Sequence, residues 1–255
     1  NASETYNGTS WTEGNNLGTA RSNIRGLGTV PASLATGGYV SGAVGNTEEY
    51  NGTSWSEQND LSTARWNVAQ AGVQTAAVAT TGSTPSLSNS TEEYDGTSWT
   101  SGTNFPETRT SAAGTGTSTA MAVLGGTNSS PSGPGTDTQI AEYNGSSWTI
   151  VSGTLLNKRT GMISNGPASL CLNSLGYDTT GYVSTSELYN GTTCVTQPSL
   201  ATSRSGSGGG NGSMPSTSAI VFGGSNNPTP NSADSATEEF TGETSVVTAS
   251  TLTTS

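Results

Sequence analysis

The sequence predicts an all-β fold, a single β-propeller built from four-stranded antiparallel blades. A short phrase that contains an aromatic residue, Asn-Gly or Asp-Gly, and Trp returns every 44 to 51 residues. A period in this range is typical of repeat architectures in which each unit buries its apolar face against its neighbours. One period also contains four strand-like segments, and no part of the chain shows the apolar spacing of a helix.

The phrase itself marks the outer half of each unit. Its copies are Tyr6–Trp11, Tyr50–Trp55, Tyr94–Trp99 and Tyr143–Trp148, with weaker copies at Tyr189–Cys194 and Phe240–Ser245. Asn-Gly or Asp-Gly between two strand-like segments predicts a tight hairpin, because a type I′ turn needs positive φ at both central residues.

The unit that begins at Arg65 shows all four strands, which we call a, b, c and d. We expect them at 67–73, 75–80, 91–94 and 97–100. Strand a is rich in small residues, strand b is more apolar, and a polar stretch separates strand b from strand c. The alternation of short strands and turns is that of one propeller blade.

We expect one propeller domain over 1–255. Its repeat units are approximately 1–20, 21–64, 65–108, 109–158, 159–203 and 204–255. Strand pairs a–b occur five times and pairs c–d six times, so we prefer five blades, in which a terminal c–d pair closes the ring. Six blades are the alternative and would need an a–b pair that these residues do not contain. The chain starts at Asn1 inside a repeat, from which we expect a processed product or a segment of a longer polypeptide.

The composition limits the classes of partner. The net charge is −11, from 7 basic and 18 acidic residues, with no histidine. This charge argues against binding of nucleic acid in a basic groove and against adsorption to anionic lipid. No apolar run is long enough to insert into a membrane. Although only 29% of the residues are hydrophobic, the even spacing of the aromatic residues indicates an ordered chain.

Several features resemble the kelch-type β-propeller repeat. They are the glycine doublet after strand b, the acidic residue before the aromatic one, the Trp that follows, and the Arg that opens the next unit. The doublet occurs as Gly37-Gly38, Gly125-Gly126 and Gly223-Gly224, and in weaker form as Thr81-Gly82 and Leu175-Gly176. The spacing from the aromatic residue to Trp is one residue shorter than in that family. The resemblance implies a propeller fold and a recognition platform rather than one activity.

The repeated charged residues predict a structural network. The arginines are Arg21, Arg65, Arg109, Arg159 and Arg204, and the strand-c glutamates include Glu48 and Glu92. We expect each Arg to make a fork-shaped contact with a strand-c Glu of an adjoining blade. Paired carboxylates can also serve a glycosidase, but catalysis needs one pair with divergent pKa values, whereas these pairs recur in every unit. We therefore predict no enzyme, no cofactor and no metal site.

The repeated tryptophans and the two cysteines are also expected to be structural. Trp11, Trp55, Trp99 and Trp148 share one position in strand d, where an indole would fill the space between outer blade edges. Stacking on sugars is the alternative for these residues, and the unrepeated Trp66 is a candidate surface contact. Cys171 and Cys194 lie in strands b and d of one blade, about 10 Å apart. This exceeds the reach of a disulfide, so we expect two free, buried thiols.

The connections between strands b and c are the candidate binding surface, because they vary most and emerge on one face. They span 39–46, 83–90, 127–139, 177–185 and 225–236. The candidate ligand-binding residues are Asn128, Asp137, Tyr177, Asp178, Tyr182 and Asp234, and the alternative is that these are solvated loops without a ligand. Asn89 and Asn128 lie in sequons and are candidate glycosylation sites.

The phrase Thr-Glu-Glu-Tyr-Asn-Gly-Thr-Ser-Trp is similar in style to repeats in structural proteins of environmental bacteriophages. This resemblance implies an extracellular or virion-surface module, such as a phage tail fibre, tailspike or capsid decoration. We expect it to assemble with other virion or filament proteins, to form a homo-oligomer, and to bind a host surface glycan or protein. The alternative is a secreted bacterial adhesin or a subunit of an extracellular filament. A glycan-active propeller enzyme is less favoured.

Overall fold

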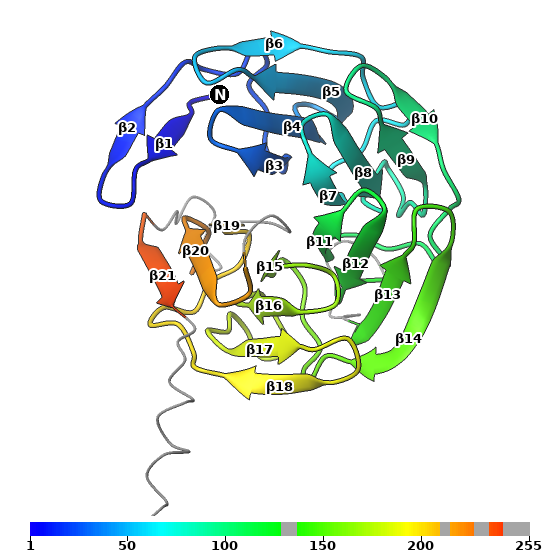
Figure 1. Ribbon diagram of the computed structural model, residues 1–255, viewed down its shortest axis with the longest axis vertical. Coiled ribbons are helices and arrows are strands. Elements are labelled where there is room, and N and C mark those ends of the chain that lie inside the picture. Colours follow the sequence, from blue (N-terminus) through cyan, green and yellow to red (C-terminus); the bar gives the residue numbers. More distant parts are fainter. Residues whose placement is uncertain (129–136, 210–214, 227–234, 242–255) are drawn as a thin grey trace, which may run out of the picture.

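The computed structural model describes residues 1–128, 137–209, 215–226 and 235–241, and it confirms an all-β propeller of five blades (Figure 1). The blades surround a common axis, and in each blade the strands run outwards in chain order. No described residue is helical, so no described helix could cross a membrane.

Four blades have four strands. Blade 1 contains β3 (Arg25–Thr29), β4 (Ala32–Tyr39), β5 (Ala43–Tyr50) and β6 (Trp55–Glu57). Blade 2 contains β7 (Ala69–Val73), β8 (Ala76–Thr80), β9 (Thr91–Tyr94) and β10 (Trp99–Ser101). Blade 3 contains β11 (Ala113–Thr117), β12 (Ala120–Leu124), β13 (Gln139–Tyr143) and β14 (Trp148–Thr154). Blade 4 contains β15 (Ile163–Asn165), β16 (Cys171–Ser174), β17 (Ser186–Tyr189) and β18 (Cys194–Gln197).

Blade 5 shows three described strands, β19 (Gly208–Gly209), β20 (Ser218–Phe222) and β21 (Thr237–Thr241). Its expected strand d, in the weak phrase copy that ends at Ser245, lies outside the described residues.

The N-terminal hairpin is the surplus c–d pair, and it closes the ring between blade 5 and blade 1. Its strands, β1 (Glu4–Tyr6) and β2 (Trp11–Glu13), form a separate two-stranded sheet. On one side, Tyr6 donates from its hydroxyl to Glu239 of blade 5 over 3.1 Å. On the other side, Trp55 of blade 1 donates from Nε1 to the Ser3 hydroxyl over 3.4 Å.

The predicted type I′ turn is wrong. Tyr50 faces Trp55 across the hairpin, which leaves a loop of four residues instead of two. Asn51 Oδ1 accepts hydrogen bonds from the backbone N–H groups of Thr53 and Ser54, both at 2.9 Å, and Gly52 has a φ of 91°. Because the Asn side chain caps the loop, only the glycine needs a left-handed conformation. Strand d therefore begins at the Trp, later than predicted.

The glycine doublet is where each blade meets the next. Its first residue is left-handed in every copy, even where it is Thr81, with a φ of 59°, or Leu175, with a φ of 64°. A left-handed conformation is unfavourable for such residues by about 1–2 kcal/mol, so the surrounding contacts must hold it in place. The second residue donates its backbone N–H to the carbonyl of the next blade's repeat Arg. These bonds run from Gly38 to Arg65, Gly82 to Arg109, Gly126 to Arg159 and Gly176 to Arg204, at 2.8–2.9 Å.

Aromatic side chains fill the outer part of the same seams. The Tyr94 ring packs on Trp99, with centroids 4.9 Å apart, and its hydroxyl donates to Glu49 of the preceding blade over 3.0 Å. Burial, followed by the bond to Glu49, raises the pKa of Tyr94. Trp99 is buried and donates from Nε1 to the Thr47 hydroxyl, also in the preceding blade. The indole therefore lies between two blades.

The cysteines are both free and buried, as the sequence predicts. Tyr189 of β17 is the register partner of Cys171 on one side and of Cys194 on the other, so a strand separates the two thiols. Burial raises the pKa of Cys171 to about 11 and that of Cys194 to about 12.

We predict that neither thiol reacts with a disulfide reagent at pH 8 while the chain is folded. At that pH the buried thiols are almost fully protonated, and the thiolate is the reactive species. Both thiols should react once guanidinium unfolds the chain. Because unfolded thiols ionise near pH 8.5, the free energy of unfolding should fall as the pH rises above that value. Rapid reaction of one thiol in buffer without denaturant would contradict the burial. The variant Cys194→Ser would then show which of the two cysteines reacts.

Candidate functional site

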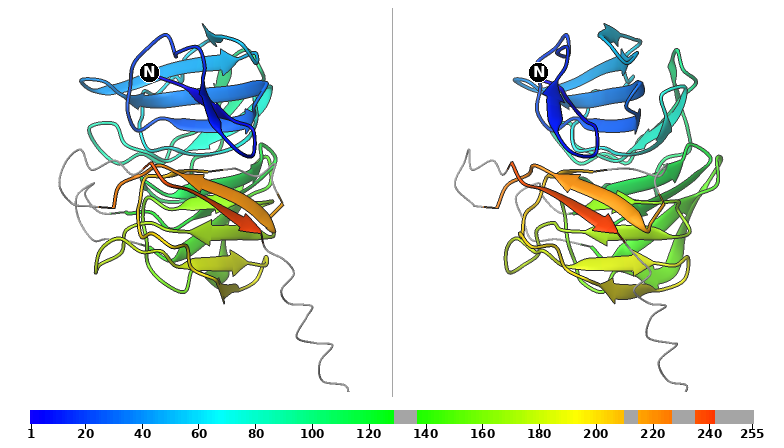
Figure 2. Two further views of the ribbon diagram at one scale, coloured as in Figure 1. Left: turned by 90° about the vertical axis from the view of Figure 1, so that its left-hand side faces the viewer. Right: turned by 60° about the vertical axis from the view of Figure 1, so that its left-hand side comes forward.

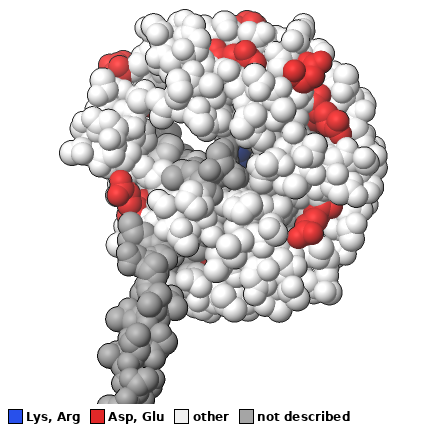
Figure 3. Space-filling model, in the orientation of Figure 1, with Lys and Arg blue, Asp and Glu red and all other residues white. Residues whose placement is uncertain are grey.

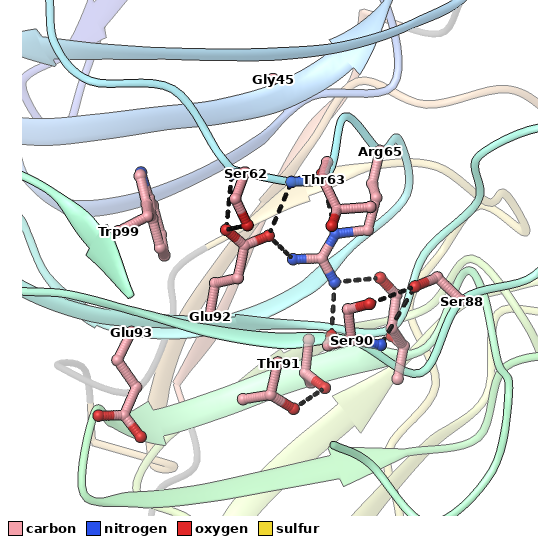
Figure 4. Close-up of polar contacts among 12 residues, drawn as sticks. Gly45, Ser62, Thr63, Arg65, Ser88, Ser90, Thr91, Glu92, Glu93 and Trp99 are labelled. Carbon is pink, nitrogen blue, oxygen red and sulfur yellow. Dashed lines mark hydrogen bonds and ion pairs between the residues drawn. The ribbon is translucent and has the colours of Figure 1, made fainter. Parts of the chain in front are cut away.

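Each repeat arginine pairs with a carboxylate of its own blade, so the predicted pairing with an adjoining blade is wrong. In blade 2, Arg65 Nη2 lies 2.9 Å from Glu92 Oε1, and both side chains are inaccessible to solvent (Figure 4). Arg65 Nη1 also donates to the carbonyls of Thr81 and Ser90. The second oxygen of Glu92 accepts from the backbone N–H and the hydroxyl of Ser62, at 2.7 and 2.6 Å.

The position of the arginine in the chain explains this geometry. Arg65 precedes strand a, so its side chain reaches across the end of its own sheet to strand c. Its backbone carbonyl meanwhile accepts from Gly38 of blade 1. One residue thus joins two blades, through its backbone on one side and its side chain on the other. The equivalent pairs are Arg21–Glu48, Arg159–Glu187 and Arg204–Glu238.

In blade 3, a loop residue supplies the carboxylate that pairs with the repeat arginine. Ala141 stands where the other blades have the strand-c glutamate, and Arg109 pairs with Asp137, 2.9 Å away, and with Glu107. Asp137 also accepts from the backbone N–H of Gln139 through its other oxygen. The structure therefore places Asp137, a predicted ligand-binding residue, in the internal ion-pair network.

The b–c connections and the segments that lead into strand a lie at one end of the sheets, because the four strands of a blade alternate in direction. The first of these connections is shorter than predicted. Strand β4 extends to Tyr39 and β5 begins at Ala43, so most of 39–46 is strand and only a short turn remains. Parts of the blade 3 and blade 5 connections, including Asp234, lie outside the described residues.

The blade 4 loop brings three predicted residues together. The rings of Tyr177 and Tyr182 meet edge to face with centroids 5.2 Å apart, and Tyr177 is 41% exposed. Between them, Asp178 Oδ1 accepts from the backbone N–H groups of Thr180 and Gly181 at 2.6 and 3.0 Å. Burial tends to raise the pKa of Asp178, but the bonds from Thr180 and Gly181 together lower it. This loop presents two aromatic rings beside an ionised carboxylate.

A second aromatic pair lies at the equivalent position of blade 1. The sequence predicts a surface contact for one of its members, Trp66, but not for the other, Tyr39. Tyr39 follows the glycine doublet as Tyr177 does, is 38% exposed, and packs edge to face on Trp66 with centroids 5.1 Å apart. The signal that could have identified it is the shared Gly-Tyr step after strand b.

The two candidate glycosylation sites differ in accessibility. Asn128 is exposed. Asn89 is half-buried, and its side-chain nitrogen donates to the Phe105 carbonyl over 3.2 Å. A glycan would be attached to that same nitrogen, so Asn128 is the better placed of the two.

A hollow of about 760 Å³ opens between the N-terminal hairpin and blade 5, and sequence reasoning did not predict it. Figure 2 shows the strands of the N-terminal hairpin, β1 and β2, opposite β20 and β21 of blade 5. Figure 3 shows an opening in the face of the disc. The lining combines aromatic residues of the hairpin and blade 5, including Tyr6, Trp11 and Phe222, with residues of the innermost strands. The volume falls within the usual range of ligand pockets, about 300–1,000 Å³.

The inner wall of the hollow contains a cation without a carboxylate partner among the described residues. Arg25 donates from Nε to the Val68 carbonyl over 3.3 Å and forms none of the ion pairs that hold the repeat arginines. Burial lowers its pKa. Gln70 lines the same hollow, is 95% buried, and has no hydrogen-bond partner for either amide atom within the described chain. These two side chains offer free donors to a polar or anionic group.

No cluster of three or more potential metal ligands occurs among the described residues. No protein-family model matches the chain, and no curated protein is similar to it.

We predict that Arg65→Ala lowers the free energy of unfolding by about 3–5 kcal/mol, because it leaves Glu92 buried without its partner. Replacing both residues, as in Arg65→Met with Glu92→Leu, should cost less than the single change. Chemical denaturation measures both values. Lys158→Ala is the control, since Lys158 is exposed, and it should be neutral. A double variant as unstable as Arg65→Ala would contradict the charge-burial explanation.

Proposed function

We propose that this propeller is a non-enzymatic recognition module of a virion surface, in a tail fibre, tailspike or capsid decoration, whose b–c loops bind a host glycan or receptor. One observation supports this above others. The repeated charged and aromatic residues are used in contacts within and between blades, whereas the loops at one end differ from blade to blade and carry aromatic pairs in which one ring, Tyr39 or Tyr177, is exposed.

The chemistry of these pairs suits a neutral or weakly charged sugar. An aromatic face stacks on the apolar face of a sugar ring, while the phenol oxygen and nearby polar groups bind hydroxyl groups. Tyr177 and Tyr182 supply the faces, and Asp178 between them supplies an acceptor. Tyrosine is well suited to this task because it loses little conformational entropy on binding. The net charge of −11 disfavours a strongly acidic polysaccharide at this surface.

The virion assignment rests on the style of the repeat phrase, and the surroundings of the gene test it. Head and tail genes beside this one would support a virion component. Secretion genes would instead support an adhesin or filament subunit and would overturn the virion proposal, while leaving the loop-face binding surface to be tested separately.

We predict that the chain binds a subset of glycans on an array and that Tyr177→Ala with Tyr182→Ala weakens this binding about tenfold or more. The loss follows from removing two aromatic contacts worth about 0.5–1.5 kcal/mol each. Leu170→Ala is the matched control, because Leu170 is exposed in the same blade but belongs to the a–b turn at the opposite end. Equal thermal stability of the variants should accompany the result. Absence of binding would argue for a purely structural role, whereas equal binding by all variants would exclude the blade 4 loop as the binding site.

A further inference from the structure

We propose that the hollow between the N-terminal hairpin and blade 5 is a docking site for a strand pair. The occupant is an antiparallel a–b pair of this same repeat type, preceded by an arginine. Docking would complete a sixth blade of which β1 and β2 already form the outer half. This inference goes beyond the loop-face function and does not depend on it.

The hairpin occupies the place of strands c and d of a blade. Tyr6 contacts Glu239 as Tyr94 contacts Glu49 in the complete blades, with the same groups and the same register. The indole contacts repeat as well. They are Trp11 to Thr237, Trp55 to Ser3 and Trp99 to Thr47, and each acceptor stands three residues before the repeat aromatic residue of the preceding unit. The hairpin is therefore positioned as part of a blade, and no a–b pair joins it among the residues that the structure describes.

The hairpin also carries a repeat carboxylate that has no arginine partner among the described residues. Glu4 occupies the position that Glu48 and Glu92 hold in blades 1 and 2, where each carboxylate binds the arginine in front of strand a. Glu4 is exposed, borders the hollow, and forms no ion pair or side-chain hydrogen bond with a described residue. A missing a–b pair would bring such an arginine to this carboxylate.

On the opposite side of the hollow, blade 5 has a backbone N–H that lacks, among the described residues, the bond its equivalents make. In blades 1 to 4 the second residue of the doublet donates its backbone N–H to the carbonyl of the next unit's arginine. Gly224 holds this position in blade 5, and its N–H has no such bond within the described chain. An arginine that binds Glu4 through its side chain could accept from Gly224 through its backbone, as Arg65 binds Glu92 and accepts from Gly38.

The inner edge of β1 is free of a paired strand within the described chain. Strands β5, β9, β13, β17 and β21 each pair with strand b on their inner side, but among the described strands β1 pairs only with β2. An unpaired edge offers its N–H and C=O groups to an added strand. The walls beside it are residues of β3, β19 and β20, including Leu27, Gly209 and Ile220. These walls belong to the two blades that would flank a sixth one.

The test uses a fluorescent peptide with the sequence of residues 65–82, which contains the leading arginine and strands a and b of blade 2. We expect it to bind the chain and to slow hydrogen exchange at the backbone amides of Glu4–Tyr6. Glu4→Gln in the chain, or Arg65→Ala in the peptide, should each weaken binding about tenfold. The two changes together should cost little more than one. Glu57→Gln is the control, since Glu57 is an exposed glutamate at the outer edge of blade 1, and it should leave binding unchanged.

A second experiment does not require the peptide to be soluble on its own. The same segment joined to the C-terminus through a flexible Gly-Ser linker should raise the Tm, and Glu4→Gln should abolish the rise while leaving the Tm of the unextended chain unchanged. No rise in Tm, or binding that is indifferent to Glu4→Gln, would overturn the proposal. A stable dimer that the peptide cannot dissociate would assign the hollow to a second copy and would also overturn it.

Discussion

A buried arginine at each seam constrains the rest of this ring. Its guanidinium holds strand c of its own blade while its carbonyl holds the preceding blade, so orientation within a sheet and spacing between sheets are set together. Buried ion pairs contribute little net stability, because desolvation offsets their attraction, but a misplaced partner is costly. In a chain with only 29% hydrophobic residues, many strand positions are Ala, Gly, Ser or Thr. Such strands could slip in register if packing were the sole restraint. A slip would separate each arginine from its carboxylate and leave a buried charge unpaired, and the free-energy cost of that charge opposes the slip.

This arrangement separates scaffold from surface. Most residues that recur are engaged internally. The groups left for other molecules are the exposed rings of Tyr39 and Tyr177, the side chains of Arg25 and Gln70 in the wall of the hollow, and Glu4, a repeat glutamate that forms no ion pair with a described residue. Asp137 illustrates the converse. It belongs to a variable loop, yet the loss of the usual glutamate at Ala141 draws it into the scaffold. Position in a loop is therefore weaker evidence of function than the absence of an internal partner.

The sequence predicted the features that depend on periodicity and missed those that depend on geometry. The strand pattern, the existence of one surplus c–d pair and the separation of Cys171 from Cys194 follow from counting units, but counting did not tell which terminal pair is the surplus one. The turn was assigned wrongly because the side chain of Asn51 competes with the backbone for the same N–H groups. The arginine partner was assigned to the wrong blade because every unit offers an identical glutamate, so spacing cannot distinguish neighbouring sheets. The hollow could not be foreseen as a space, since it arises only when the ring is closed.

The turns capped by asparagine are sites at which the chain can deamidate over time. Asn followed by Gly is the sequence most prone to spontaneous loss of the side-chain amide, and four of the six Asn-Gly steps of this chain lie in the repeat phrase, at Asn7, Asn51, Asn144 and Asn190. The fifth turn already has a carboxylate: Asp95 accepts the same two backbone bonds, from Thr97 and Ser98, at 2.8 Å. These bonds lower the pKa of Asp95, which keeps it ionised. Deamidation to aspartate would thus add negative charge around one rim while leaving the hairpins intact.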